Sequence, residues 1–144
     1  MQVTEQIKAD VTSAMKARER ERVAALRLVL SELQKAAKDG DGSDELAVLR
    51  RERKRRRESE TAYRDAGRED LAAQEAFEAE TIEAYLPQEL SDAELDVLVR
   101  DAIEQTGASG PRDMGAAIKH TLAAADGRAD GKRVSAMVRE ALAR

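Results

Sequence analysis

The sequence contains no cysteine, no tryptophan, only two prolines and three aromatic residues, Tyr63, Phe77 and Tyr85. The absence of cysteine excludes disulfide bonds, thiolate zinc sites and cysteine nucleophiles. No apolar run approaches the roughly 18 residues that a membrane span needs, and the first twenty residues lack the apolar segment of a signal peptide. We therefore expect a soluble protein of the reducing cytoplasm, with no membrane partner.

So few aromatic residues require an aliphatic core, and the 38% of charged residues together with abundant alanine and leucine is typical of long helices. No segment alternates between apolar and polar residues as a strand would. Two apolar stripes recur at helical spacing instead. The first consists of Val3, Ile7, Val11 and Met15, and the second of Val23, Leu26, Leu30, Leu33 and Ala37. The predicted fold class is all-α.

Turn and capping residues divide the first part of the chain into four predicted helices. The glycines and aspartates at 39–42 end the second helix, and Ser43 is the predicted N-cap of the third. That third helix should run to about Ala66, where Gly67 stops it. A fourth should extend from about Arg68 to Leu86, because Pro87 cannot continue it. Residues 1–87 are therefore expected to form a four-helix lobe.

Three further helices are predicted after Pro87. Ser91 and Glu94 have the spacing of a capping box, and Gly107 ends the fifth helix that they open. A sixth helix should run from about Pro111 to Ala125, with Ile118 and Leu122 facing inward. Asp130 should cap the seventh. Residues 88–144 are thus expected to form a three-helix lobe, with Leu86 and Leu90 near the boundary.

Charge is strongly segregated along the chain. Residues 1–57 carry 15 basic and 10 acidic side chains, residues 58–96 carry 2 and 13, and residues 97–144 carry 8 and 6. The formal net charge of −4 therefore says less about partners than the sign asymmetry does.

The densest positive charge lies in the predicted third helix. Seven of the eight residues from Arg50 to Arg57 are basic, and no residue from Arg50 to Thr61 is apolar. Arg50, Arg53, Lys54 and Arg57 share one side at helical spacing. Such a strip is suited to contact nucleic-acid phosphates, with an affinity that depends on salt.

An alternative interpretation is that this helix is an ion-paired structural face. Pairs at i,i+4 spacing are Glu52 with Arg56, Lys54 with Glu58 and Arg56 with Glu60. The fourth helix would add further partners if the two helices pack antiparallel, because it carries Glu75, Glu78, Glu80 and Glu83. The sequence leaves both interpretations open.

The residues give no sign of a complete active site. His120 is the only histidine, and we interpret it as a surface or boundary residue rather than a catalytic base. No serine or threonine has a neighbouring base motif, and no ligand spacing indicates a metal. We therefore predict no metal, no cofactor and no catalysis by this chain alone.

Four segments together resemble the GatB/YqeY family, and specifically its stand-alone YqeY-like proteins. They are RRRESETAYRDAGREDLAAQE (55–75), IEAYLPQELSDAEL (82–95), TGASGPRDMG (106–115) and GRADGKRV (127–134). The resemblance covers essentially the whole chain. It implies two helical bundles, of four and then three helices.

The better-understood relative within that family is the C-terminal tail of GatB. This tail is the tRNA-binding appendage of a glutamine-dependent aminoacyl-tRNA amidotransferase, a carbon–nitrogen ligase whose catalytic centres lie elsewhere. The resemblance therefore implies a non-catalytic accessory protein that binds tRNA or a tRNA-amidotransferase complex. Two alternatives are a protein–protein adaptor that uses the basic helix, and a participant in amide transfer that needs a partner for catalysis.

The last of the four segments also has a physical interpretation. Gly127 can adopt positive φ to end the sixth helix, and Asp130 can cap the seventh. Gly131 would let a backbone segment or a ligand approach the helix N-terminus closely. Arg128 and Lys132 would then flank a phosphate site. The equally open alternative is a tight turn under packing constraint.

Overall fold

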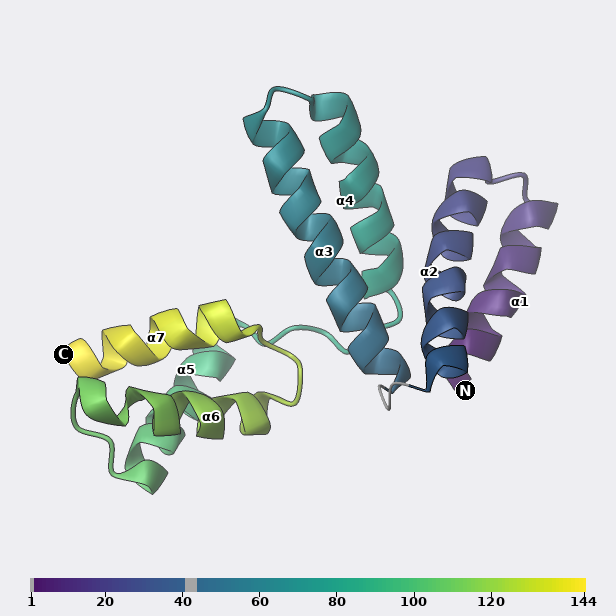
Figure 1. Cartoon of the computed structure of the whole chain (residues 1–144). Coiled ribbons are helices and arrows are strands. Elements are labelled where there is room, and N and C mark those ends of the chain that lie inside the picture. Colours follow the sequence, from purple (N-terminus) through teal and green to yellow (C-terminus); the bar gives the residue numbers. More distant parts are fainter. Residues whose placement is uncertain (1, 41–43) are drawn as a thin grey trace. The chain divides into compact units, whose positions relative to one another are not determined.

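The computed structural model describes residues 2–40 and 44–144, which form helices and connecting segments with no strand (Figure 1). The α-helices are α1 (Gln2–Lys16), α2 (Arg20–Asp39), α3 (Glu45–Asp65), α4 (Glu69–Glu83), α5 (Asp92–Thr106), α6 (Met114–Ala125) and α7 (Gly131–Ala143). A short 3₁₀ helix, η1 (Pro111–Asp113), precedes α6. The all-α prediction is confirmed. None of the described helices is both long enough and apolar enough to cross a membrane.

The chain divides into two compact units, Met1–Leu86 (unit 1) and Pro87–Arg144 (unit 2). In unit 1, α1 and α2 form one antiparallel hairpin, and α3 and α4 form another (Figure 1). The two hairpins share a core whose largest fully buried side chains include Ile7, Leu26, Leu49 and Ile82. These residues remove apolar surface from water and so stabilise the unit.

One member of the first predicted stripe does not join this core. Ile7 and Val11 are buried and Val3 packs against the core, but Met15 is 52% exposed. The reason is geometric. Four helical residues turn through about 400°, so a strict four-residue repeat drifts by about 40° at each step. Three steps from Val3 carry Met15 away from the buried face.

Unit 2 encloses a second core, which includes Leu95, Val99, Val134 and Val138. The helix α6 faces this core with Ala117, Thr121 and Ala125, at i, i+4 and i+8. The prediction that Leu122 faces inward is wrong, because its side chain is exposed. Small residues on the buried face of α6 allow the neighbouring helices to approach it closely.

Most predicted helix ends are confirmed, and a few shift. Gly67 and Gly107 adopt positive φ, and the capping box between Ser91 and Glu94 is present. The helix α4 ends at Glu83, three residues before the predicted Leu86.

At the start of the sixth helix, the predicted residues 111–113 form η1 instead, because Pro111 opens a 3₁₀ turn. The predicted cap Ser43 lies outside the described residues, and Asp44 caps α3 by accepting a hydrogen bond from the N–H of Ala47 at 2.6 Å.

A carboxylate ties the two hairpins of unit 1 together near the start of α1. The backbone N–H and the hydroxyl of buried Thr4 both donate to Oε2 of Glu45, at 2.7 and 2.6 Å. Burial alone would raise the pKa of Glu45, but hydrogen bonds such as these outweigh it and lower the pKa from 4.5 to about 2.

Replacing Glu45 by glutamine is expected to lower the free energy of unfolding by about 1–2 kcal/mol at pH 7. Because the folded-state pKa lies below the unfolded value, the carboxylate contributes fully above about pH 4.5 and loses its contribution as the pH falls toward 2. Urea unfolding curves of the two proteins should therefore converge over that range. Glu5→Gln, at an exposed surface pair on α1, is the control and should change little. A stability difference that does not vary with pH would contradict this explanation.

Candidate nucleic-acid interface

The basic segment lies in the middle of α3, where it has two different faces. One face points toward α4 and the core, and it carries Val48, Leu49 and Glu52 as buried residues. The opposite side carries Arg51 and Lys54, which are both exposed. The same helix therefore combines an ion-paired interior face with a solvent-exposed basic face.

On the face toward α4, Arg56 lies between two acids. Its guanidinium is 3.8 Å from Oε2 of Glu52 in the same helix and 3.5 Å from Oε2 of Glu78 in α4. The side chain of Glu52 is 2% exposed and that of Arg56 is 11% exposed. The predicted Glu52–Arg56 pair is therefore confirmed, and it belongs to a largely buried charge cluster.

Glu75 of α4 is close to the same cluster. Its Oε2 is buried and has no hydrogen-bond partner in the described structure. Burial, and secondarily the charge of Glu78, raises the pKa of Glu75, while Arg56 and Arg55 oppose that rise. The interface between α3 and α4 thus holds more negative charge than Arg56 neutralises.

Arg57 is also held by acids. It donates to Oε1 of Glu83 in α4 at 2.9 Å and to Oε1 of Glu60 at 2.8 Å. Burial alone would lower the pKa of Arg57, but these two partners raise it. Glu60 also pairs with Arg64, at 3.0 Å. The i,i+4 pattern had instead predicted a pair between Glu60 and Arg56. The expected packing of bases against the acids of α4 is thus observed for Arg56 and Arg57.

The remaining predicted residues of α3 differ among themselves. Lys54 is exposed and Arg50 is half-buried, and neither makes an ion pair with another described residue. Arg53 does have an interaction partner. Arg51, which the sequence prediction omitted, is exposed and also lacks an ion pair in the described ranges. The basic surface of α3 therefore consists of Arg50, Arg51 and Lys54, flanked by Arg55, which is 3.7 Å from Glu52.

In the segment 127–132, Arg128 has a role within the fold. Its Nε donates to the carbonyl of Gln88 at 2.7 Å, and its own carbonyl accepts from the N–H of Leu90 at 2.8 Å. These two bonds hold the segment that enters α5 against the turn between α6 and α7. Lys132 is exposed and has no ion pair with the described residues.

The predictions for the turn between α6 and α7 are partly confirmed. Asp130 caps α7 by accepting from the N–H of Arg133 at 2.8 Å. Gly127 has φ of 79°, but α6 already ends at Ala125, and its C-cap Asp126 is itself left-handed at φ 47°. A Cβ at Gly131 would meet no atom of the described residues within 4 Å, so none of them makes the expected close approach of a backbone segment.

The structure gathers a second group of bases that the sequence prediction missed. Arg18, Arg20 and Arg27 line a hollow of about 550 Å³ at the turn between α1 and α2, beside the exposed Met15. Nη2 of Arg27 lies 3.5 Å from the sulfur of Met15. The run of bases from Lys16 to Arg22 was visible in the sequence, but the contribution of Arg27 depends on how α2 passes α1.

Comparison with known proteins identifies the family. The sequence profile described as "Yqey-like protein" matches residues 4–142. The chain belongs to this YqeY-like family. No curated protein matches the chain. The family match thus spans both units.

The only histidine of this YqeY-like chain does not have the surroundings of an oriented catalytic base. His120 is half-buried on α6, and its Nδ1 has no hydrogen-bond partner in the described structure. Nδ1 therefore has no carboxylate to orient it as a catalytic base would need. Among residues 2–40 and 44–144, no cluster of three or more acidic or histidine side chains could hold a metal ion.

Proposed function

We propose that this YqeY-like protein is a non-catalytic accessory module that binds tRNA, or a complex that handles tRNA, in the cytoplasm. The observation that supports the proposal is the basic surface of α3, formed by Arg50, Arg51 and Lys54. These bases lack acidic partners among the described residues, although acids are plentiful on the neighbouring α4. Unpaired cations of this kind gain affinity by releasing counterions from phosphates. The choice of tRNA among nucleic acids rests on the resemblance to the GatB tail.

We also propose that α1–α4 and α5–α7 act as two lobes, residues 1–87 and 88–144. The two hydrophobic cores support this, because they have no residue in common. Lys132 on the second lobe would bind a further phosphate. Arg128, whose Nε is engaged by Gln88, would contribute mainly by holding the entry to α5.

The triple variant Arg50→Gln, Arg51→Gln, Lys54→Gln is expected to weaken tRNA binding and leave α3 folded, because glutamine is about as good a helix former. The slope of log affinity against log salt should become shallower by about 0.7–0.9 for each phosphate that the variant no longer neutralises. Fluorescence anisotropy with labelled tRNA at several salt concentrations measures both quantities.

Two matched variants make this measurement specific. Replacing Lys35, Lys38 and Arg139 by glutamine removes the same charge from exposed positions elsewhere and should leave the slope nearly unchanged. Arg57→Gln removes an ion-paired base and should lower stability by up to about 1 kcal/mol with little effect on tRNA affinity. Equal slopes for the triple variant and the wild type, or no tRNA binding by the wild type, would overturn the proposal.

A further inference from the structure

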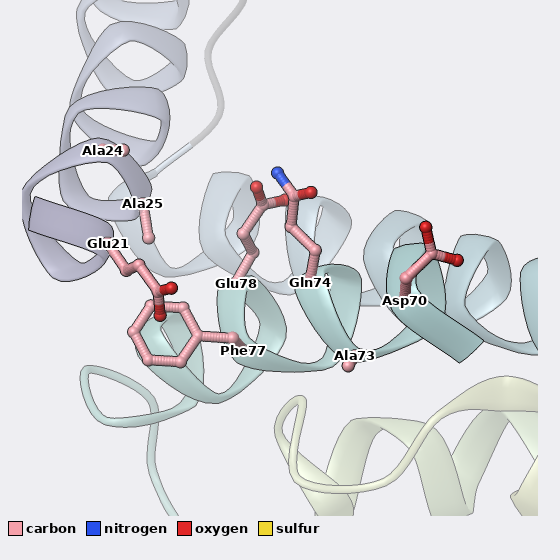
Figure 2. Close-up of a pocket in the computed structure, with 8 residues that line it drawn as sticks. All are labelled: Glu21, Ala24, Ala25, Asp70, Ala73, Gln74, Phe77 and Glu78. Carbon is pink, nitrogen blue, oxygen red and sulfur yellow. The ribbon is translucent and has the colours of Figure 1, made fainter. Parts of the chain in front are cut away.

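Unit 1 contains a groove between α2 and α4, which are the facing helices of its two hairpins (Figure 2). The groove has a volume of about 480 Å³. On the side of α2 it is lined by Ala24 and Ala25, and on the side of α4 by Ala73 and Phe77. Because alanine side chains are short, they leave the space between the two helices unfilled. The ring of Phe77 reaches into this space and remains 36% exposed.

Polar residues also line the groove, and on α4 they recur every four residues. Asp70, Gln74 and Glu78 succeed one another along one side of α4, and Glu21 extends from α2 toward Phe77 (Figure 2). Glu78 lies eight residues after Asp70, which is about 12 Å along the helix. The groove is therefore long enough to hold about two turns of another helix.

The charge of the groove has one sign only. Its lining contains Glu21, Asp70 and Glu78 and no base, and α4 as a whole carries six acidic residues and no basic one. Glu21 makes no ion pair with the described residues, whereas Asp70 pairs with Arg68 and the nearly buried Glu78 pairs with Arg56. Phosphates would be repelled here, so this surface does not suit RNA.

We propose that the groove binds a helix of a partner protein that presents small apolar residues flanked by lysine or arginine. The alanines allow the backbone of such a helix to approach closely, and its apolar ridge would cover Phe77. The flanking bases would reach the exposed Glu21 and Asp70 at the rim. This inference is independent of the proposed tRNA binding, because it uses a different surface with the opposite charge.

The test uses two designed helical peptides of about 15 residues with the same alanine–leucine ridge, flanked by lysines in one and by glutamates in the other. Binding of each labelled peptide to the full chain is measured by fluorescence anisotropy. The lysine peptide should bind about tenfold or more tightly than the glutamate peptide, because several rim charges change from attraction to repulsion. Backbone NMR shifts should then be confined to α2 and α4.

Variants of the groove make the test specific. Ala73→Lys fills the groove and adds a like charge, and it should weaken the lysine peptide about tenfold. Phe77→Ala should also weaken it, whereas Val97→Ala, at a 64% exposed apolar residue of α5, is the matched control and should change nothing. The triple glutamine variant of α3 should bind the peptide normally, which separates this proposal from tRNA binding.

Three results would overturn the proposal. The first is equal binding of the two peptides or no binding of the lysine peptide. The second is an unchanged affinity in Ala73→Lys. The third is a dimer of the wild-type chain in solution that Ala73→Lys converts to a monomer, since the groove would then hold a second copy of this chain.

Discussion

Replacing Arg56 by alanine is expected to lower the free energy of unfolding of unit 1 by about 3–5 kcal/mol. Arg56 lies between Glu52 and Glu78, and all three side chains are at most 12% exposed. Its removal leaves their carboxylates, and that of Glu75, in the interface between α3 and α4 with no buried counter-charge. Urea unfolding followed by circular dichroism at pH 7 measures the loss.

The pH dependence of this loss identifies its cause. Burial, followed by the charge of Glu78, already raises the pKa of Glu75, and Arg56 opposes that rise. Without Arg56 the folded-state pKa of Glu75 should rise further above its unfolded value. An acid with a raised folded-state pKa destabilises the protein above that pKa, and the penalty is relieved as the pH falls through it. The deficit of Arg56→Ala should therefore shrink in mildly acidic solution.

Two companion variants separate charge from packing. Arg55→Ala removes a 68% exposed partner of Glu52 and should cost less than about 1 kcal/mol. Replacing both Glu52 and Arg56 by methionine should cost less than Arg56→Ala alone, because the buried carboxylate is removed with its partner. A deficit that is equal at pH 4 and pH 7, or an equal effect of Arg55→Ala, would show that the cluster does not act through charge.

This cluster also shows what the sequence could and could not predict. The Glu52–Arg56 pair is local, and helical spacing alone placed the two residues together. The partners Glu78 and Glu83 are distant in sequence, and their alignment depends on the register that the turn at Gly67 imposes on α3 and α4. The sequence indicated that acids would face bases there, but not which base would be enclosed.

The positions of the helices were also predictable, because the signals that start and end a helix are local. Capping and stop signals such as the Ser91–Glu94 box and Gly107 are local, and the structure confirms them. The residues that face inward were predicted less well. Met15 and Leu122 belong to apolar patterns, but they do not lie on the buried faces of their helices. Small residues occupy the buried face of α6, and a pattern search that favours large apolar side chains misses them.

The sequence predicted which helix carries the candidate site, but not which of its bases are free. Composition identified α3 as basic, but only packing separates Arg57, which α4 engages, from Lys54, which faces solvent. The groove of Figure 2 was not predictable, because it results from alanines on two helices that are distant in sequence. Nothing in the composition of either helix indicates that a gap will remain between them.

Replacing Leu95 by alanine is expected to unfold most of unit 2 and leave unit 1 folded. Leu95 is fully buried in the core of unit 2, and removing such a side chain costs about 2–5 kcal/mol. A helical unit of this size is stabilised by only about 3–5 kcal/mol from its core. The loss is therefore comparable to the whole stability of the unit.

Circular dichroism and backbone NMR measure this result together. The helical signal should fall by the share that α5, α6 and α7 contribute, while the resonances of α1–α4 keep their dispersion. Val97→Ala, at an exposed position of the same helix, is the control and should change stability by less than about 0.5 kcal/mol. If Leu95→Ala instead melts all seven helices in one transition, the two cores fold as one cooperative unit. The proposal of separate lobes at residues 1–87 and 88–144 would then be wrong, because lobes that fold independently respond only to changes in their own core.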